Sequence, residues 1–325
     1  MRPPTRPGRA PRPLDPARAR TVPLGRRPSK VALAAACRPV RRGMSVRQLL
    51  SGMPDILAGR ELREAAARIA QALRRGRPVV LGMGAHPLKV GLGPLLVDLI
   101  RRRRLAAVAM NGACLIHDFE LAWGGRTSED VGPGLDRGLF GMARETGEFL
   151  NAAIAGGARR GVGIGQAVGE AIGRARLPLR RASVLAAAAE AGIPATVHVA
   201  IGTDIIHMHP GADGAATGAG SLHDFRLLAA VVGGLEGGVY LNLGSAVVLP
   251  EVFVKALNLA RNLGRRVRAL TTIDMDFQRH YRPAVNVVGR PTALGGRGIQ
   301  LTGHHEIMLP LLWAGVEEAL ARPWR

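Results

Sequence analysis

The chain has few cysteines, few lysines and few aromatic residues, and each shortage narrows the possible classes of protein. Its two cysteines, Cys37 and Cys114, provide neither a disulfide framework nor a CxxC metal pattern, which fits a reducing compartment and predicts a cytoplasmic protein. No apolar run is long enough to cross a membrane. Lysine occurs only at Lys30, Lys89 and Lys255, so nearly all of the positive charge is carried by arginine.

The net charge of +21 is unevenly distributed along the 325 residues. Residues 1–43 hold twelve of the 45 basic residues and one acid, Asp15, and they are rich in proline without apolar periodicity. Because such a segment cannot form a packed core, we expect a disordered extension, with Met44 as an alternative start of translation. Aromatic residues make up 3% of the chain, which leaves few platforms for stacking bases, so we do not expect a nucleic-acid partner.

Strand and helix patterns alternate through residues 44–325, which we expect to form one domain. With 47% hydrophobic residues the chain can bury a large core. We expect strands at 78–84, 105–112, 194–202, 237–244 and 266–274, helices at 61–75, 93–104, 221–234, 250–263 and 305–321, and a mostly helical segment at 113–190. This alternation predicts an α/β fold with a mostly parallel, Rossmann-like central sheet and helices on both faces.

Polar residues follow the expected strands, at the positions where parallel sheets of this kind bind ligands. The turn "GMGAHP" at 82–87 is GxGxxP rather than GxGxxG, so it is either a phosphate-binding turn or a plain tight turn. In "NGACLIHDFELAW", at 111–123, His117 and Asp118 begin a helix, where they are either helix-capping residues or a polar pair that faces a cleft.

The stretch "IGTDIIHMHP", at 201–210, combines one aspartate and two histidines. On an extended segment His207 and His209 would share a face and, with Asp204, could ligate a divalent metal, whereas on a helix they would diverge. Further ligands could come from "HHE" at the start of the last helix, which consists of His304, His305 and Glu306. The spacing matches no established metal signature, and the sequence contains no nucleophile elbow, P-loop or HExxH motif. A metal site, acid/base chemistry and a structural role therefore remain open.

Taken in order, the strand ends from about residue 55 to 320 resemble those of the deoxyhypusine synthase family. The segments that carry the resemblance are "VVLGMGAHPLKVGLGPLLVDL", "AMNGACLIHDFEL", "SVLAAAAEAGIPATVHVAIGTDI", "GGVYLNLGSAVVLPEVFVKALNLAR", "ALTTIDMDF" and "LTGHHEIMLPLL". Each match is loose, and the collinear order makes the resemblance specific. The family uses NAD to oxidise spermidine, carries the aminobutyl group on an enzyme lysine and passes it to another amine.

The resemblance implies a deoxyhypusine-synthase-like fold, an NAD cofactor, a small-molecule substrate and a homotetramer. It places beside the dinucleotide Gly82, Gly84, Asn111, Gly112, Thr203, Gly244, Ser245, Thr272, Asp276, Gly303 and His304. It also implies that the substrate lies near His207 and His209. Because imidazoles titrate near neutral pH, these two are candidate acid/base groups, and the other candidate catalytic residues are Asp204, Asp118 and His117.

The sequence departs from the family at the catalytic lysine. The family's lysine lies in a Ser-Trp-Gly-Lys segment, and the comparable residues 282–298 contain neither lysine nor tryptophan. Arg290 lies there, but a guanidinium stays protonated and cannot form an imine. Lys89 could substitute only if the geometry allowed it.

We therefore expect an NAD-dependent enzyme that acts on an amine or related polar small molecule without the family's aminobutyl transfer. One alternative is a non-catalytic dinucleotide-binding protein. The other is a metal-dependent hydrolase or lyase, built on His207, His209, His304, His305 and Glu306.

Overall fold

A computed structural model describes residues 12–324 of the chain. The chain divides into two compact units, residues 1–36 and 37–325. The described part of the first unit forms short 3-10 turns at Pro16–Arg18, Leu24–Arg26 and Leu33–Ala35, and nearly all of its side chains are exposed. Residues 1–11 of the expected extension lie outside the described residues, and its disorder stays a prediction.

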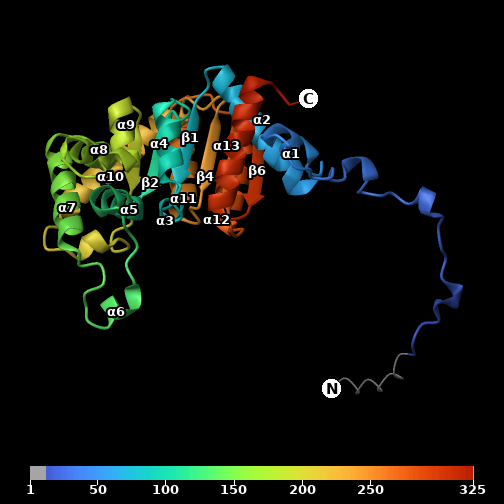
Figure 1. The fold of residues 1–325 in the computed structure, drawn as a ribbon, viewed down its shortest axis with the longest axis horizontal. Coiled ribbons are helices and arrows are strands. Elements are labelled where there is room, and N and C mark those ends of the chain that lie inside the picture. The colour runs from blue at the N-terminus through green and yellow to red at the C-terminus, as the bar shows by residue number, and fades with distance from the viewer. Residues whose placement is uncertain (1–11, 325) are drawn as a thin grey trace, which may run out of the picture. The chain divides into compact units, whose positions relative to one another are not determined.

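The second unit is built on a six-stranded parallel sheet in the order β3-β2-β1-β4-β5-β6 (Figure 1). The strands are β1 (Val79–Met83), β2 (Ala107–Asn111), β3 (Ala195–His198), β4 (Val239–Leu243), β5 (Thr271–Asp276) and β6 (Arg297–Thr302). The strand order reverses between β1 and β4, and we call this place the switch point. Doubly wound sheets bind their ligands beyond the carboxyl ends of the strands at such a point.

Helices cover both faces of this sheet. The helices described in residues 12–324 are α1 (Val46–Gly52), α2 (Leu57–Arg74), α3 (His86–Lys89), α4 (Gly93–Arg101), α5 (Gly112–Gly124), α6 (Val131–Leu135), α7 (Arg144–Arg159), α8 (Ile164–Arg174), α9 (Val184–Ala191), α10 (Gly214–Val232), α11 (Val248–Asn262), α12 (Tyr281–Pro283) and α13 (His305–Ala321). A π-helical segment, Ala284–Gly289, follows α12. No helix among residues 12–324 combines the length and the apolar character needed to cross a bilayer.

Alternate residues of β1, β2 and β4 face two separate hydrophobic clusters, as expected for a sheet covered on both sides. Leu81 and Met83 pack on the face covered by α2, α4, α5, α9 and α13. Val80 and Tyr240 pack on the opposite face with α10, α11 and the π-helical segment, where the Tyr240 ring stacks on Phe253 at a centroid distance of 3.8 Å. The α/β fold class is therefore confirmed.

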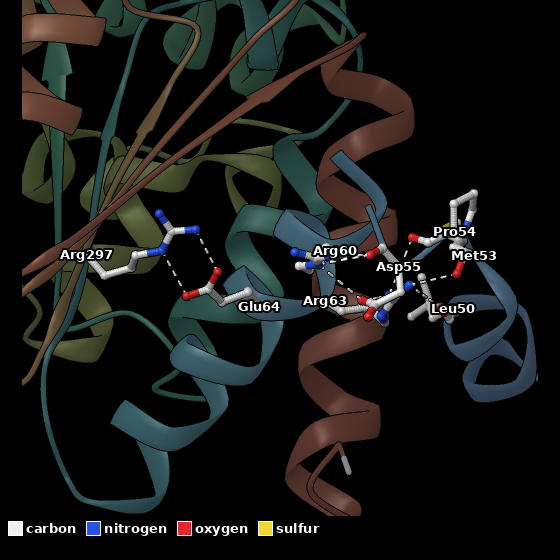
Figure 2. Close-up of polar contacts among 8 residues, drawn as sticks. All are labelled: Leu50, Met53, Pro54, Asp55, Arg60, Arg63, Glu64 and Arg297. Carbon is white, nitrogen blue, oxygen red and sulfur yellow. Dashed lines mark hydrogen bonds and ion pairs between the residues drawn. The ribbon is translucent and has the colours of Figure 1, made fainter. Parts of the chain in front are cut away.

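Two arginines attach α2 to its surroundings (Figure 2). Arg63 donates to the carbonyl oxygens of Leu50 and Met53 and to the Asp55 carboxylate, and so holds the connection between α1 and α2. Arg297, at the start of β6, donates to both carboxylate oxygens of Glu64 on α2, at 2.9 and 2.7 Å. The second pair joins the last strand of the sheet to the helix that covers it.

The strand β6 was not expected from the sequence. It lies at the edge of the sheet, and only Ile299 and Leu301 among its residues are buried, so it has no continuous apolar run. It also follows two glycines, Gly295 and Gly296, which favour a turn. Its pairing with β5, from Thr271 opposite Arg297 to Asp276 opposite Thr302, comes from main-chain contacts that side-chain patterns do not reveal.

Candidate functional site

A cavity of about 180 Å³ lies beside the carboxyl ends of β2 and β3. Its walls come from α3, α5, the loop around α6 and the turn that follows β3. Three carboxylates and one ammonium group line it, and these belong to Glu120, Glu129, Asp204 and Lys89. The cavity therefore lies at the edge of the sheet where ligands of this fold class bind, and it carries more negative than positive groups.

The His117 ring, in the wall of the cavity, is held in one orientation by a chain of hydrogen bonds. Thr127 Oγ1 donates to Glu120 Oε2 at 2.5 Å, so it accepts the hydrogen of His117 Nδ1 at 2.6 Å. Burial, assisted by the positive charge of Lys89, lowers the pKa of His117 to about 4. His117 is therefore neutral at pH 7, with its unprotonated Nε2 available as a hydrogen-bond acceptor.

The Asp204 carboxylate lies against the first turn of α5. A Cβ atom at Gly112 would overlap this carboxylate, so glycine is required at the start of the helix. Burial raises the pKa of Asp204, while nearby His207 acts in the opposite direction. An anion at a helix N-terminus is favourable. Gly112 and Asp204 are thus in contact, and the side chain of the protein itself occupies the helix start.

His207 and His209 do not share a face, because residues Ile205–Met208 form a 3-10 helix instead of an extended segment. His207 Nδ1 accepts from the main-chain N–H of Gly202 at 3.1 Å and holds the turn after β3. The buried His209 ring bonds through Nε2 to the Gly141 carbonyl at 2.8 Å. The two histidines therefore diverge, as expected for a helical segment. Each ring makes a hydrogen bond with a nearby main-chain group.

The five residues of the metal alternative are not assembled into one site. His304 and Glu306 are exposed at the start of α13, whereas His305 is fully buried against His86. Within residues 12–324, no group of three or more histidine, cysteine, aspartate or glutamate side chains is placed to hold a metal ion. The expectation that the clusters at 207–209 and 304–306 would combine is therefore not met.

Asp118 is a structural residue. Its buried carboxylate accepts hydrogen bonds from Ser183 Oγ at 2.5 Å and from the main-chain N–H groups of Val184 at 2.7 Å and Leu185 at 3.1 Å. It thus caps the N-terminus of α9 from its position on α5. Burial raises the pKa of Asp118 to about 6 in spite of these bonds. The sequence left open whether Asp118 caps a helix or faces a cleft. In the structure it caps a helix, but that helix is α9 and not α5, on which Asp118 lies.

Glycines allow the two strand ends at the switch point to approach each other. A Cβ at Gly84 would overlap the carbonyl oxygen of Gly244, and the Gly84 N–H donates to the Leu243 carbonyl at 3.1 Å. Gly244 has φ +61°, and a Cβ there would lie 2.8 Å from the His305 ring. Ser245 Oγ then accepts from the Leu249 N–H at 3.1 Å, in the first turn of α11.

The remaining residues implied by the resemblance are not all at the sheet edge. Asn111 ends β2 and accepts from the Cys114 thiol at 3.1 Å. Thr203 is exposed, and its hydroxyl donates to the Ala200 carbonyl at 2.7 Å. Elsewhere, the Gly303 N–H donates to the Asp276 carbonyl at 2.9 Å.

Two of the implied positions lie inside the sheet. Thr272 is fully buried near the start of β5. Gly82 lies within β1, where a Cβ would overlap the Tyr240 hydroxyl. Gly82 lies one residue before the carboxyl end of β1 and Thr272 four residues before that of β5, and both are packing positions.

Glu120 and Glu129 were not singled out from the sequence, and His86 was noted only as part of the turn at 82–87. Glu120 lies three residues after His117 on α5, a spacing that puts the two on one helix face and could have identified it. Glu129 lies in an irregular loop that no periodicity marks. His86 ends the "GMGAH" turn, and its importance depends on a contact with His305 that is 219 residues away in sequence.

No protein-family model matches the chain, and no curated protein matches it. Solved structures share its fold. A putative deoxyhypusine synthase from Entamoeba histolytica is 11% identical with a TM-score of 0.52, over 88% of this chain and 97% of that one. AgrE, solved as a ternary complex with ornithine and NAD+, is 19% identical with a TM-score of 0.52, over 83% of this chain and 35% of AgrE.

The arginine dihydrolase ArgZ, from the ornithine-ammonia cycle in cyanobacteria, is 18% identical with a TM-score of 0.51, over 81% of this chain. This chain spans about a third of the length of ArgZ and AgrE, 32% and 35% respectively. The comparisons establish the fold, and the expected deoxyhypusine-synthase-like architecture is confirmed.

Proposed function

We propose that this chain is an NAD-dependent enzyme that oxidises an amine or related polar small molecule bound in the cavity beside α5. The observation that carries the proposal is the charge of that cavity, in which Glu120, Glu129 and Asp204 outnumber Lys89. Carboxylates bind a protonated amine through charge-assisted hydrogen bonds, which are stronger than neutral ones. The volume of about 180 Å³ suits a ligand of the size of an amino acid or a small diamine.

The switch point has features that suit a dinucleotide. Gly84 and Gly244 bring the main chain of two strand ends together, and Ser245 leads into α11, whose first N–H groups favour an anion such as a pyrophosphate. Asn111, at the end of β2, presents an amide that would bond a ribose hydroxyl. NAD bound there would accept a hydride from a C–H bond of the substrate. AgrE, which shares the fold, is described with ornithine and NAD+.

The side chains of the cavity have separate tasks in this proposal. Glu120 is held by Thr127 and Thr146, so its carboxylate keeps a fixed position for a substrate ammonium group. The neutral His117 offers Nε2 as an acceptor for a substrate N–H. The Phe140 side chain also lines the cavity, where an apolar ring reduces the access of water to these groups.

The aminobutyl transfer of the resembled family is not part of the proposal. Residues 282–298 lack the lysine and form the end of α12, the π-helical segment and the start of β6. Lys89 does line the cavity, but its side chain is at an exposed position near the rim. A homotetramer and a cytoplasmic location, which the sequence led us to expect, remain proposals.

Thermal unfolding of the full chain in the presence of single ligands tests the proposal. We expect NAD to raise the Tm, and diamines or basic amino acids to raise it further, because each binds only the folded state. Glu120→Gln should weaken amine binding about tenfold or more, since it removes one charged hydrogen bond, and should leave NAD binding unchanged. Glu190→Gln, an exposed position on α9, is the matched control.

Two outcomes would overturn the proposal. A rise in Tm with divalent metals alone would favour the metal alternative. Binding of NAD without any amine oxidation would leave only a dinucleotide-binding protein.

A further inference from the structure

Two imidazole rings meet at the switch point. His86 follows β1 as the first residue of α3, and His305 is the first residue of α13. Their Nδ1 atoms are 2.7 Å apart, which is a hydrogen-bond distance. One of these atoms must therefore carry a hydrogen and the other a lone pair, so a single N–H···N hydrogen bond joins the two rings.

The buried Asp276 carboxylate determines which ring donates. Asp276 ends β5, and its Oδ1 lies 3.8 Å from His305 Nε2, within ion-pair range but longer than a hydrogen bond. His305 is fully buried, and among residues 12–324 its Nε2 has no hydrogen-bond partner. A lone pair on Nε2 would face a carboxylate, whereas an N–H is attracted to it. The favoured arrangement has the hydrogen of His305 on Nε2, so His305 Nδ1 accepts from His86 Nδ1–H.

This arrangement leaves a lone pair on His86 Nε2, at the less buried end of the pair. The His86 ring is half-buried, with the Phe277 ring at a centroid distance of 5.3 Å, and Phe277 also contacts His305 edge-on at 5.8 Å. His86 and Lys89 both lie on α3, three positions apart, and Lys89 lines the acidic cavity. His86 and the cavity-lining Lys89 thus lie on the same short helix.

We propose that His86, His305 and Asp276 form a proton relay for oxidation of the substrate, with His86 Nε2 as the catalytic base. The assignment rests on the proposed function for its chemistry. Bound NAD would supply the hydride acceptor for the substrate C–H bond, and as the C=N bond formed the proton of the substrate N–H would pass to His86 Nε2. The hydrogen on His86 Nδ1 moves to His305 Nδ1, which places the positive charge next to the Asp276 carboxylate. His305 and Asp276 are positioning residues that act through His86.

Several charged groups face the relay and affect its titration. The Asp276 carboxylate favours the protonated pair, and Glu306 acts in the same direction from the next position on α13. His280 Nε2 lies 3.9 Å from Asp276 Oδ2 and competes for the carboxylate when it is protonated. Asp274 lies two residues earlier on β5, and burial, with a smaller contribution from the Asp276 carboxylate, raises its pKa. Burial is the largest influence on His305 and lowers its pKa, so burial disfavours a positive charge on this ring.

Nitrogen NMR of full-length protein labelled at histidine, recorded without NAD, tests the relay. We expect His305 to carry its hydrogen on Nε2 and His86 to carry its hydrogen on Nδ1. Asp276→Asn should lower the pKa of His305, because the carboxylate no longer stabilises the charged ring. His223→Gln, at an exposed position on α10, is the control and should change neither ring.

A second variant keeps the test decisive if Asp276→Asn fails to fold. His86→Gln should alter the His305 resonances, keep NAD binding and abolish amine oxidation. A hydrogen on His305 Nδ1 in the wild type, or an unchanged pH titration in Asp276→Asn, would overturn the relay. Failure of the wild type to bind NAD would reject the proposed function, while the tautomers and titration would still report on the relay.

Discussion

Replacing Asp118 with alanine should destabilise the protein more at pH 4.5 than at pH 7.5. Alanine leaves the buried N–H groups of Val184 and Leu185 and the Ser183 hydroxyl without their acceptor. Each unsatisfied buried donor costs about 1–3 kcal/mol. We therefore expect the variant to lose about 4 kcal/mol of free energy of unfolding at a pH where the Asp118 carboxyl of the wild type is protonated and no charge is buried.

The pH dependence follows from the raised pKa of Asp118. Burial raises this pKa from 3.8 to about 6, so the folded state binds the proton more tightly than the unfolded state. The stability from this group is complete below pH 3.8 and is lost as the pH rises through 6. Between pH 4.5 and 7.5 the wild type loses about 2 kcal/mol through this group, which the alanine variant cannot lose. The variant should therefore be about 4 kcal/mol less stable at pH 4.5 and about 2 kcal/mol less stable at pH 7.5.

Urea unfolding of both proteins at the two pH values measures this difference directly. Asp136→Ala, an exposed aspartate after α6, controls for general effects of removing a carboxylate. If the destabilisation by Asp118→Ala is equal at the two pH values, or larger at pH 7.5, burial does not determine the titration of this carboxyl.

Two further predictions concern charges near the cavity and at the edge of the sheet. Lys89→Met should raise the pKa of His117 above about 4, but burial should keep it below 6.5, and proton NMR of the His117 ring checks both limits. A pKa that stays constant or falls would mean that the ammonium does not act on the ring. Hydrogen bonds from Arg297 hold the pKa of Glu64 at about 2. The stabilisation of the folded state by this pair is therefore present above pH 4.5 and is lost as the pH falls toward 2. Glu64→Gln should lower the free energy of unfolding by up to about 1 kcal/mol at pH 7, because the pair is partly exposed, and should have no effect near pH 2.

The sheet could be predicted from the sequence where burial dictates residue type. The five strands from β1 to β5 are apolar runs that end at glycines or polar residues, and the expected helix 305–321 coincides with α13. The edge strand β6 could not be predicted, because solvent exposure permits Arg297 and Gln300 in it and its position depends on main-chain pairing with β5.

The site could be predicted only in part, since it depends on contacts between segments far apart in the chain. Asp204 and His117 each follow an expected strand and both line the cavity, while their catalytic roles stay predictions. The partners of Asp118 lie about 65 residues away on α9, so nothing local distinguished a cap from a catalytic acid. His86 follows β1 and His305 follows β6, and they meet across 219 residues of sequence, a contact that no motif in either segment reveals.

Calorimetric titration of the metal-free full chain with NAD tests the proposed function most directly. We expect saturable binding at one site per chain with a Kd of about 1–100 μM, a typical range for a reversible small ligand, and tighter binding when a diamine is present. Absence of binding to both NAD and NADP, together with stoichiometric binding of a divalent metal by the same preparation, would contradict a dinucleotide-dependent enzyme on this fold.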